Sequence, residues 1–240
     1  MPWYYDVAER DHALQNPTSP DKIRLLGERL RLGPESRVLD LACGKAGPAL
    51  LLADAFGCRV LGVERAPEFA AAARERVEAA GLADRIEIVE GDAAAFSLQP
   101  SAWDAVLCLG ATFVWHGLEG TLEALTPAVP SGGYVVVGEP FWRAWPLPEG
   151  VDDDGYVPLR ATVARVEAAG LALVTTIAAS EDDWDTYESL HWRALEEWLA
   201  ENPHDPDTVA IRERYETQRE AYLRHERALL GWAIFVGRKP

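Results

Sequence analysis

Short apolar runs alternate with amphipathic stretches through the first 140 residues. Five runs have the length and character of buried strands, at 37–42, 58–64, 85–91, 103–110 and 132–139. The segments between them predict helices at 47–56, 67–80 and 118–126. An earlier helix is expected at 18–32, with Ser19 as its N-cap and Pro20 at its first position. Repeated strand–helix–strand units predict right-handed crossovers and a parallel sheet covered by helices on both faces.

The pattern changes after Glu139. Residues 140–158 are rich in proline, glycine and aromatic residues, so we expect an irregular insertion there. A helix is expected at 159–169 and a strand at 171–179. Two amphipathic helices follow, separated by 201–206, and the last strand is expected at 231–238. The apolar faces of the two amphipathic helices contain Tyr187, Leu190, Ala194, Leu195 and Trp198, and Ile211, Tyr215, Tyr222 and Leu229. We therefore expect an α/β fold with a doubly wound sheet, in a single domain over 1–240.

Composition and charge limit the classes of molecule that the protein is expected to bind. With 48% hydrophobic residues among 240, the chain can bury a substantial core. No apolar run reaches the roughly 18 residues of a membrane-spanning helix, and the N-terminus lacks the features of a signal peptide, so we expect a cytoplasmic protein. A net charge of −16 opposes binding to nucleic acid and to anionic membrane surfaces. Cys43, Cys58 and Cys108 lack the spacing of a metal site or a disulfide framework, so we expect buried thiols.

The segment "VLDLACGKAGPAL" (38–50) has the form of a nucleotide-binding loop. It is not a P-loop, because Leu39 stands where the first glycine is needed and Ala46 where Ser or Thr is needed. The spacing of Ala42, Gly44 and Gly47 is closer to the dinucleotide pattern G-x-G-x-x-G, which leaves a nicotinamide-dependent oxidoreductase as an alternative. Asp40 weighs against that alternative, since a carboxylate roughly 4 Å from a phosphate charge costs about 4 kcal/mol at an effective dielectric of 20. A cationic ligand would instead be attracted.

Four further segments follow this loop in a recognisable order. Glu64 ends the second predicted strand, "VEGDAAAF" places Asp92 just after the third, and "WDAVLCLGATF" and "PSGGYVVVGEP" give the fourth and fifth strands. Together with "VLDLACGKAG", they resemble the class I S-adenosylmethionine-dependent methyltransferases over roughly residues 35 to 140. The resemblance implies a mostly parallel seven-stranded sheet with an antiparallel last strand and a helical insertion before it. The chain departs from the family pattern at Ala42 and Ala46, which replace glycines, and Lys45 is expected to point outward.

The resemblance also implies roles for individual residues. Asp40 would hold the methionine amino group, Glu64 would accept from the two ribose hydroxyls, and Asp92 or its backbone from the adenine amino group. The small residues of the loop would let the backbone approach the methionine part. As alternatives, Asp40 could cap the next helix, Glu64 could be a solvated strand end, and Asp92 could belong to an ordinary turn. The complete expected donor-binding set is Asp40, Ala42, Cys43, Gly44, Gly47, Glu64, Arg65, Gly91, Asp92, Ala93, Leu109 and Gly110, with Phe113 as a further wall residue.

The acceptor side is expected in the segments around this core. Residues 1–34 would form a cap, 35–139 the donor-binding core, and 140–158 and 180–230 substrate-side insertions. His116 and Glu139 are the candidates for accepting a proton, and His116 is equally compatible with a surface loop. Trp3, Tyr4 and Tyr5 precede the first helix expected from the sequence, and a tyrosine hydroxyl there is a candidate for binding the methionine carboxylate. Aromatic residues expected at the substrate are Tyr5, Trp115, Trp142, Trp184 and Tyr187, whereas core positions are expected for Trp103, Trp198 and Trp232.

No histidine pair has metal-ligand spacing, so no metal is expected, and His12, His191, His204 and His225 are expected on helix faces or the surface. The leading function is methyl transfer from S-adenosylmethionine to a small-molecule acceptor, leaving S-adenosylhomocysteine. The alternatives are the oxidoreductase on the same sheet and a non-catalytic S-adenosylmethionine-binding module that contacts a protein partner through the acidic helices at 180–230.

Overall fold

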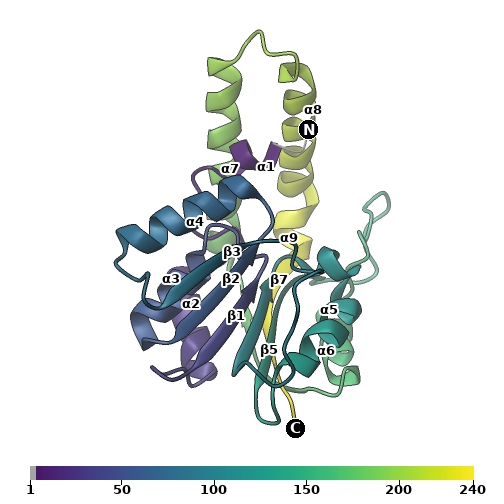
Figure 1. The fold of residues 1–240 in the computed structure, drawn as a ribbon. Helices are drawn as coiled ribbons and strands as arrows, with labels where there is room; N and C mark the ends of the chain where they lie inside the picture. The colour runs from purple at the N-terminus through teal and green to yellow at the C-terminus, as the bar shows by residue number, and fades with distance from the viewer. Residues whose placement is uncertain (1–3) are drawn as a thin grey trace.

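The computed structural model describes residues 4–240 and contains one seven-stranded sheet (Figure 1). The strand order is β3-β2-β1-β4-β5-β7-β6; the pairs from β3 to β5 are parallel, and β7 runs antiparallel to both of its neighbours. The bounds are β1 (Arg37–Leu41), β2 (Arg59–Glu64), β3 (Ile86–Glu90), β4 (Ala105–Leu109), β5 (Tyr134–Trp142), β6 (Ala172–Ala178) and β7 (Leu230–Arg238). The fold class and the antiparallel last strand expected from the sequence are confirmed.

Helices cover both faces of the sheet, as the alternating pattern predicts (Figure 1). One buried cluster joins a sheet face to α2, α3 and α4, and a second joins the opposite face to α5 and α6. The helix bounds are α1 (Tyr4–Ala8), α2 (Pro20–Arg29), α3 (Gly47–Phe56), α4 (Pro67–Ala79), α5 (Leu118–Leu125), α6 (Leu159–Ala168), α7 (Glu181–Glu201), α8 (Thr208–Ala221) and α9 (Arg227–Leu229). Short 3-10 segments are η1 (Thr112–Trp115) and η2 (Thr126–Ala128), and η3 (Tyr222–Glu226) is a π-helical turn.

The helices between β6 and β7 form a hairpin that stands away from the sheet, with α1 packed against both of its helices (Figure 1). Ser180 caps α7 through a reciprocal capping box with Asp183. A third buried cluster holds α1, α7 and α8 together and contains Tyr4, Ala8, Leu195, Leu199, Ile211 and Tyr215. The N-terminal helix is therefore tied to an insertion almost 200 residues later in the chain. No helix within 4–240 combines the length and apolarity needed to cross a bilayer.

The strand β5 is longer than its predicted range of 132–139. It continues to Trp142, which pairs with Leu230 at the start of β7. Proline is disfavoured inside a sheet because it has no N–H to donate. Pro140 is accommodated because the pairing of β5 with β4 stops at Gly138, so only β7 flanks the strand at that point.

Candidate functional site

The carboxyl ends of the parallel strands border a cavity of about 580 Å³, which we call the loop cavity because the β1–α3 loop forms one wall. Open α/β sheets bind ligands at this edge. Gly91 does not line the cavity, and its N–H donates to the Glu64 carbonyl oxygen at 2.9 Å. All other members of the expected donor-binding set line it: Asp40, Ala42, Cys43, Gly44, Gly47, Glu64, Arg65, Asp92, Ala93, Leu109 and Gly110.

The β1–α3 loop keeps its turn although alanine replaces glycine twice. The backbone φ angle is +55° at Ala42, +55° at Gly44 and +58° at Ala46. This left-handed conformation costs an alanine roughly 1–2 kcal/mol, because its Cβ approaches the following carbonyl. A hydrogen bond of 3.0 Å from the Ala46 N–H to the Cys43 carbonyl supports the turn. Both alanines therefore take a backbone conformation that glycine adopts without this penalty.

Glu64 fixes the loop from the end of β2. Its Oε2 accepts from the Gly44 N–H at 2.9 Å and its Oε1 from the Ala66 N–H at 2.8 Å. The side chain is buried yet lines the loop cavity. Since each carboxylate oxygen has two lone pairs, both oxygens keep capacity for another donor. The arrangement suits a neighbouring pair of hydroxyl groups.

Asp40 is the most strongly perturbed acid of the loop cavity. It is 2% exposed, and its buried Oδ2 has no hydrogen-bond partner among residues 4–240. Burial, and then the charge of Glu64, raise the pKa of Asp40 to about 7. A buried acceptor without a donor is unfavourable. The residues therefore fit a ligand that brings a positively charged donor to this point.

The N-terminal strap, which we define as residues 9–17, lies over the loop. The Lys45 Nζ donates to the carbonyl oxygens of Glu9 at 2.6 Å and Arg10 at 3.1 Å. The Lys45 backbone N–H donates to Gln15 Oε1 at 2.6 Å. Lys45 does not line the loop cavity, in agreement with the expectation that it points away from a ligand there. It does not reach solvent, however, because strap carbonyls hold its ammonium group and the residue is buried. The strap thus replaces solvent as the partner of this cation.

Two glycines allow the strap to approach the sheet edge closely. A Cβ at Gly47 would lie 2.2 Å from the Ala13 carbonyl oxygen, and one at Gly110 would lie 2.0 Å from Asn16 Oδ1. Asn16 also donates from Nδ2 to the Leu109 carbonyl at 3.0 Å. Glycines at the start of α3 and just after β4 therefore let the strap cover the cavity.

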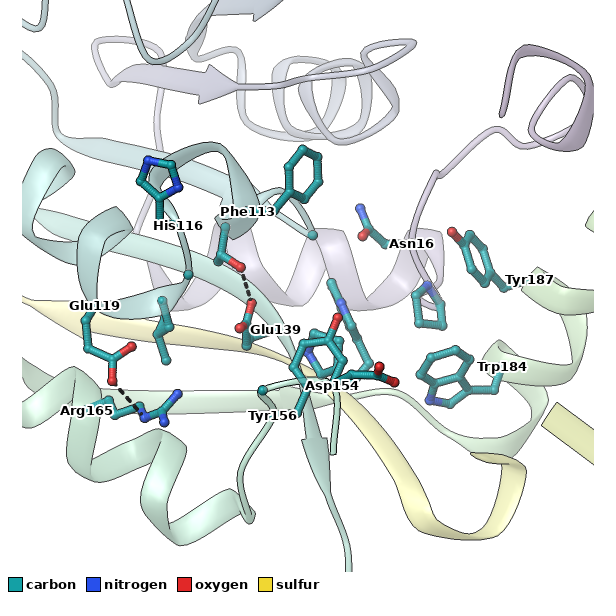
Figure 2. A pocket seen from close by; sticks show the side chains of 18 residues that line it. Asn16, Phe113, His116, Glu119, Glu139, Asp154, Tyr156, Arg165, Trp184 and Tyr187 are labelled. Carbon is teal, nitrogen blue, oxygen red and sulfur yellow. Dashed lines mark hydrogen bonds and ion pairs between the residues drawn. The ribbon is translucent and has the colours of Figure 1, made fainter. Parts of the chain in front are cut away.

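A second cavity of about 580 Å³ adjoins the first, and we call it the β5 cavity because Glu139 of β5 lies in its wall (Figure 2). The indole of Trp184 and the ring of Tyr187 reach it from α7 (Figure 2). The two cavities share the wall residues Asn16, Gly110, Phe113, Tyr156 and Tyr187. A group held in one is therefore adjacent to a group held in the other.

The structure brings both candidate proton acceptors to the β5 cavity (Figure 2). Glu139 is 7% exposed, and its Oε2 accepts from Thr112 Oγ1 at 2.7 Å. Burial raises the pKa of Glu139 to about 7, against the opposing effects of the Thr112 hydrogen bond and the Arg165 charge. His116 follows η1 as its C-cap, with a left-handed φ of +61°, and is an exposed residue of the cavity wall. A carboxylate with this pKa can accept a proton near neutral pH.

The predicted aromatic substrate residues divide between the cavity walls and the core. Trp184 and Tyr187 line the β5 cavity, but Trp115 and Trp142 line neither cavity. Trp142 is 2% exposed because β5 carries it into the core, and its Nε1 donates to the Asp153 carbonyl at 3.0 Å. Trp115 packs against the apolar cluster beneath α5. The expectation that Trp115 and Trp142 contact the substrate is therefore replaced by a packing role for both.

The aromatic residues near the N-terminus also occupy different surroundings. Trp3 lies outside the described residues. Tyr4 is buried and donates from its hydroxyl to Gln218 Oε1 at 2.7 Å, in the cluster with α8. Tyr5 lines the loop cavity, and its hydroxyl accepts from Arg214 Nη2 at 2.9 Å. Tyr5 is therefore the member of this group that stays a candidate for ligand contact.

A buried polar cluster supports the wall that the cavities share. His12 is 2% exposed, stacks at 4.3 Å on the His191 ring, and places Nε2 2.9 Å from the Tyr187 carbonyl oxygen. The Tyr187 hydroxyl donates to Glu9 Oε1 at 3.2 Å. Burial opposes the charge on His191, but its contacts with the carboxylates of Glu188 and Glu9 outweigh this and raise the pKa of His191 to about 9. The surface or helix-face position expected for His12 is wrong, since the strap buries it against α7.

Several cavity residues with polar side chains are not predicted by the sequence pattern. Most of them lie on the strap or in the 140–158 insertion, where no spacing rule connects them to the strand ends. These residues include Glu9, Gln15, Asn16, Thr112, Asp154 and Tyr156.

Two family profiles match the chain. The profile described as "Methyltransferase domain" matches residues 38–133, which contain β1 to the end of α5 and the loop before β5. A family of unknown function, DUF8026, matches residues 162–234. The first profile thus covers the strand ends that form the loop cavity, and the second covers the insertion that contributes to the β5 cavity.

Solved structures with full coverage resemble the chain closely. A methyltransferase from Geobacter sulfurreducens in complex with S-adenosyl-L-homocysteine is 31% identical, with a TM-score of 0.93 and coverage of 100% of this chain and 99% of that one. A methyltransferase from Thiobacillus denitrificans, also in complex with S-adenosyl-L-homocysteine, is 30% identical with the same TM-score and coverage. Among sequences, the 27-O-demethylrifamycin SV methyltransferase of Amycolatopsis mediterranei is 25% identical over 99% of this chain and 88% of its own length.

The fold, the cavity at the strand ends and these relatives agree with one another. They favour methyl transfer over the nicotinamide-dependent alternative, because the two solved relatives of 30% and 31% identity are S-adenosylmethionine-dependent methyltransferases in complex with S-adenosyl-L-homocysteine. The chain belongs to the S-adenosylmethionine-dependent methyltransferase family.

Proposed function

We propose that the protein transfers the methyl group of S-adenosylmethionine to a small-molecule acceptor held in the β5 cavity. The observation that carries this proposal is the wall shared by the two cavities. A nucleoside in the loop cavity would present its sulfur end toward that wall, and an acceptor in the β5 cavity would lie on the other side. Reactions of this type depend on alignment and on exclusion of water.

Three acids of the loop cavity suit the donor. Asp40 would bind the methionine ammonium group, since its buried Oδ2 has no other donor among residues 4–240. Glu64 would accept from the ribose hydroxyls while keeping its two backbone hydrogen bonds. Asp92 or the adjacent backbone would accept from the adenine amino group at the edge of the cavity. When bound, S-adenosylmethionine supplies a methyl group on a sulfonium, which a nucleophile displaces in line.

The remaining residues arrange and shield the reacting groups. The strap would cover the donor through the Lys45 and Asn16 hydrogen bonds, which keeps bulk water from the shared wall. Glu139 is the stronger candidate for accepting a proton, because it is buried at the cavity with a pKa near 7, and His116 is the second. We assign 1–34 to the cap, 35–139 to the donor core, and 140–158 and 180–230 to the acceptor side.

The size and charge of the site favour a small acceptor. A volume of about 580 Å³ lies within the range of small-molecule pockets, about 300–1,000 Å³. The net charge of −16 opposes the approach of nucleic acid. A small molecule fits both observations.

Two measurements test the proposal. Calorimetric titration with S-adenosyl-L-homocysteine should give one site per chain. Incubation with tritium-labelled S-adenosylmethionine and a bacterial extract, followed by size fractionation, should place the label in the low-mass fraction. Label confined to protein or nucleic acid would contradict a small-molecule acceptor, and absence of product binding would contradict the donor site.

A further inference from the structure

The β5 cavity is unevenly charged. Its wall contains three acids and one arginine, and the acids are Glu119, Glu139 and Asp154. Arg165 is paired with Glu119, Nε to Oε1 at 2.9 Å (Figure 2). Glu139 and Asp154 form no ion pair with any side chain of residues 4–240. The cavity therefore presents two uncompensated carboxylates to whatever it binds.

Glu139 is placed to receive a donor from the cavity. Thr112 occupies Oε2, whereas Oε1 accepts no hydrogen bond from the part of the chain that the structure describes. The residue is 7% exposed and its remaining exposure lies in the cavity wall, so water is scarce around it. The groups that act on it are the Thr112 hydroxyl, the Arg165–Glu119 pair and the Tyr156 hydroxyl, and His116 lies elsewhere in the same cavity wall. None of these supplies an uncommitted cation at Oε1, since Arg165 is already paired.

Aromatic rings surround the same space. Phe113, Tyr156, Trp184, Tyr187 and Trp232 contribute to the wall, and Figure 2 shows Tyr156 and Trp184 on either side of Asp154. The negative face of an aromatic ring attracts a cation, most strongly where water is excluded. Rings and carboxylates together favour an organic cation over a neutral or an anionic molecule. An anion within about 4 Å of Glu139 would be repelled by roughly the energy with which a cation is attracted.

We propose that the acceptor of the β5 cavity is an organic amine that is methylated on nitrogen, with Glu139 binding its ammonium group and taking one proton from it. This inference rests on the proposed function. The amine enters as R–NH₃⁺, and one N–H bond breaks as Glu139 accepts the proton. The nitrogen lone pair then forms a bond to the methyl carbon while the carbon–sulfur bond breaks and its electron pair stays on sulfur. The products are R–NH₂⁺–CH₃, S-adenosyl-L-homocysteine and the proton, which Glu139 releases to solvent.

Matched probes test the charge preference directly. Protein saturated with S-adenosyl-L-homocysteine is titrated with benzylamine, phenethylamine and tryptamine, and with alcohols and carboxylates of the same carbon skeletons, by saturation-transfer NMR. We expect at least one amine to bind about tenfold or more tightly than its alcohol, as a hydrogen-bonded charge pair implies, and the carboxylates not to bind. With labelled S-adenosylmethionine, the label should appear in that amine.

Two variants separate the carboxylates from the rest of the wall. Glu139→Gln keeps the side-chain volume and an oxygen for Thr112, and Asp154→Asn suits the left-handed φ of +50° at that position. Glu139→Gln should lower amine affinity about tenfold, and Asp154→Asn should lower it less because Asp154 is exposed, and both should leave alcohol affinity unchanged. Glu123→Gln is the control, since it removes one charge from an exposed position of α5 outside the β5 cavity. In all three variants, retained affinity for S-adenosyl-L-homocysteine reports an intact fold.

The outcomes are distinguishable. Three results would overturn the inference: equal binding of alcohols and amines, an amine preference that survives in Glu139→Gln, or no binding of any amine at about 10 mM. If the protein still binds S-adenosyl-L-homocysteine in these experiments, the proposed function is unaffected. Loss of product binding in the unmodified protein would instead remove the proposed function itself.

Discussion

Replacing Asp40 by asparagine should stabilise the ligand-free protein and weaken its binding to donor and product. The carboxylate is 2% exposed at the end of β1, and its Oδ2 has no partner in residues 4–240. Burial and the nearby charge of Glu64 raise the pKa of Asp40 from 3.8 to about 7. Asparagine has nearly the same shape and no charge, so the substitution isolates the cost of the ionised group.

The magnitude follows from linkage. A group whose pKa is higher in the folded protein gives stability that is complete below the unfolded pKa and is lost as pH rises through the folded pKa. For Asp40 the loss therefore falls between pH 4 and pH 7. At 1.36 kcal/mol per pH unit, the ionised carboxylate costs about 4 kcal/mol at pH 8 and about 2 kcal/mol at pH 5. Asp40→Asn should raise the free energy of unfolding by those amounts.

Urea unfolding at both pH values measures the change, and calorimetric titration with S-adenosyl-L-homocysteine measures binding. Loss of a charged hydrogen bond to the ammonium should cost about 2–3 kcal/mol, or about 30- to 150-fold in Kd. Asp54→Asn is the control, because it removes a carboxylate from an exposed position of α3 and should change stability by less than about 0.5 kcal/mol. Equal stability changes at pH 5 and pH 8 would refute the burial argument, and an unchanged Kd would remove Asp40 from the ammonium site.

Three further substitutions test other parts of the site. Glu64→Ala should weaken product binding by about 2–3 kcal/mol, because the loop loses two backbone hydrogen bonds and the ribose loses its acceptors; calorimetry that finds the affinity retained would assign the ribose to other groups. Gly47→Ala should destabilise the protein by about 1–3 kcal/mol by pushing Ala13 away, whereas Gly33→Ala has open space and should be neutral; equal midpoints in urea would contradict the close approach. The pKa of His191 is raised from 6.5 to about 9, so the stabilising contribution of its charge is complete below pH 6.5 and is lost as pH rises through 9. This contribution amounts to about 3 kcal/mol. Unfolding measured at pH 6 and pH 9.5 should show that His191→Gln abolishes the pH dependence of stability.

The sheet could be predicted from the sequence because strand–helix alternation limits both strand direction and crossover hand. The donor side followed for a similar reason, since the acids Asp40, Glu64 and Asp92 are placed by the ends of successive strands. Each position depends on local periodicity and on topology. Neither requires knowledge of how distant side chains pack.

The features that escaped prediction depend on contacts between distant segments. Trp142 enters the core because β5 extends along β7, whose start lies almost 90 residues later. His12 is buried because α7 brings His191 and Tyr187 against the strap. The φ angle of Ala46 is not encoded by residue type, because alanine seldom adopts the left-handed conformation. Local patterns carry no signal for these outcomes.

The Gly44 amide of the β1–α3 loop points at an anion, as the amides of phosphate-binding turns do, but that anion belongs to the protein. Glu64 occupies the position of a counter-ion, and Asp40 adds a second negative charge to the same cavity. A pyrophosphate would have to displace one carboxylate and tolerate the other, whereas a nucleoside without phosphate meets no such competition. Discrimination between classes of nucleotide therefore follows from the β1–α3 loop itself, because the Glu64 carboxylate is already hydrogen-bonded to the amide of its turn.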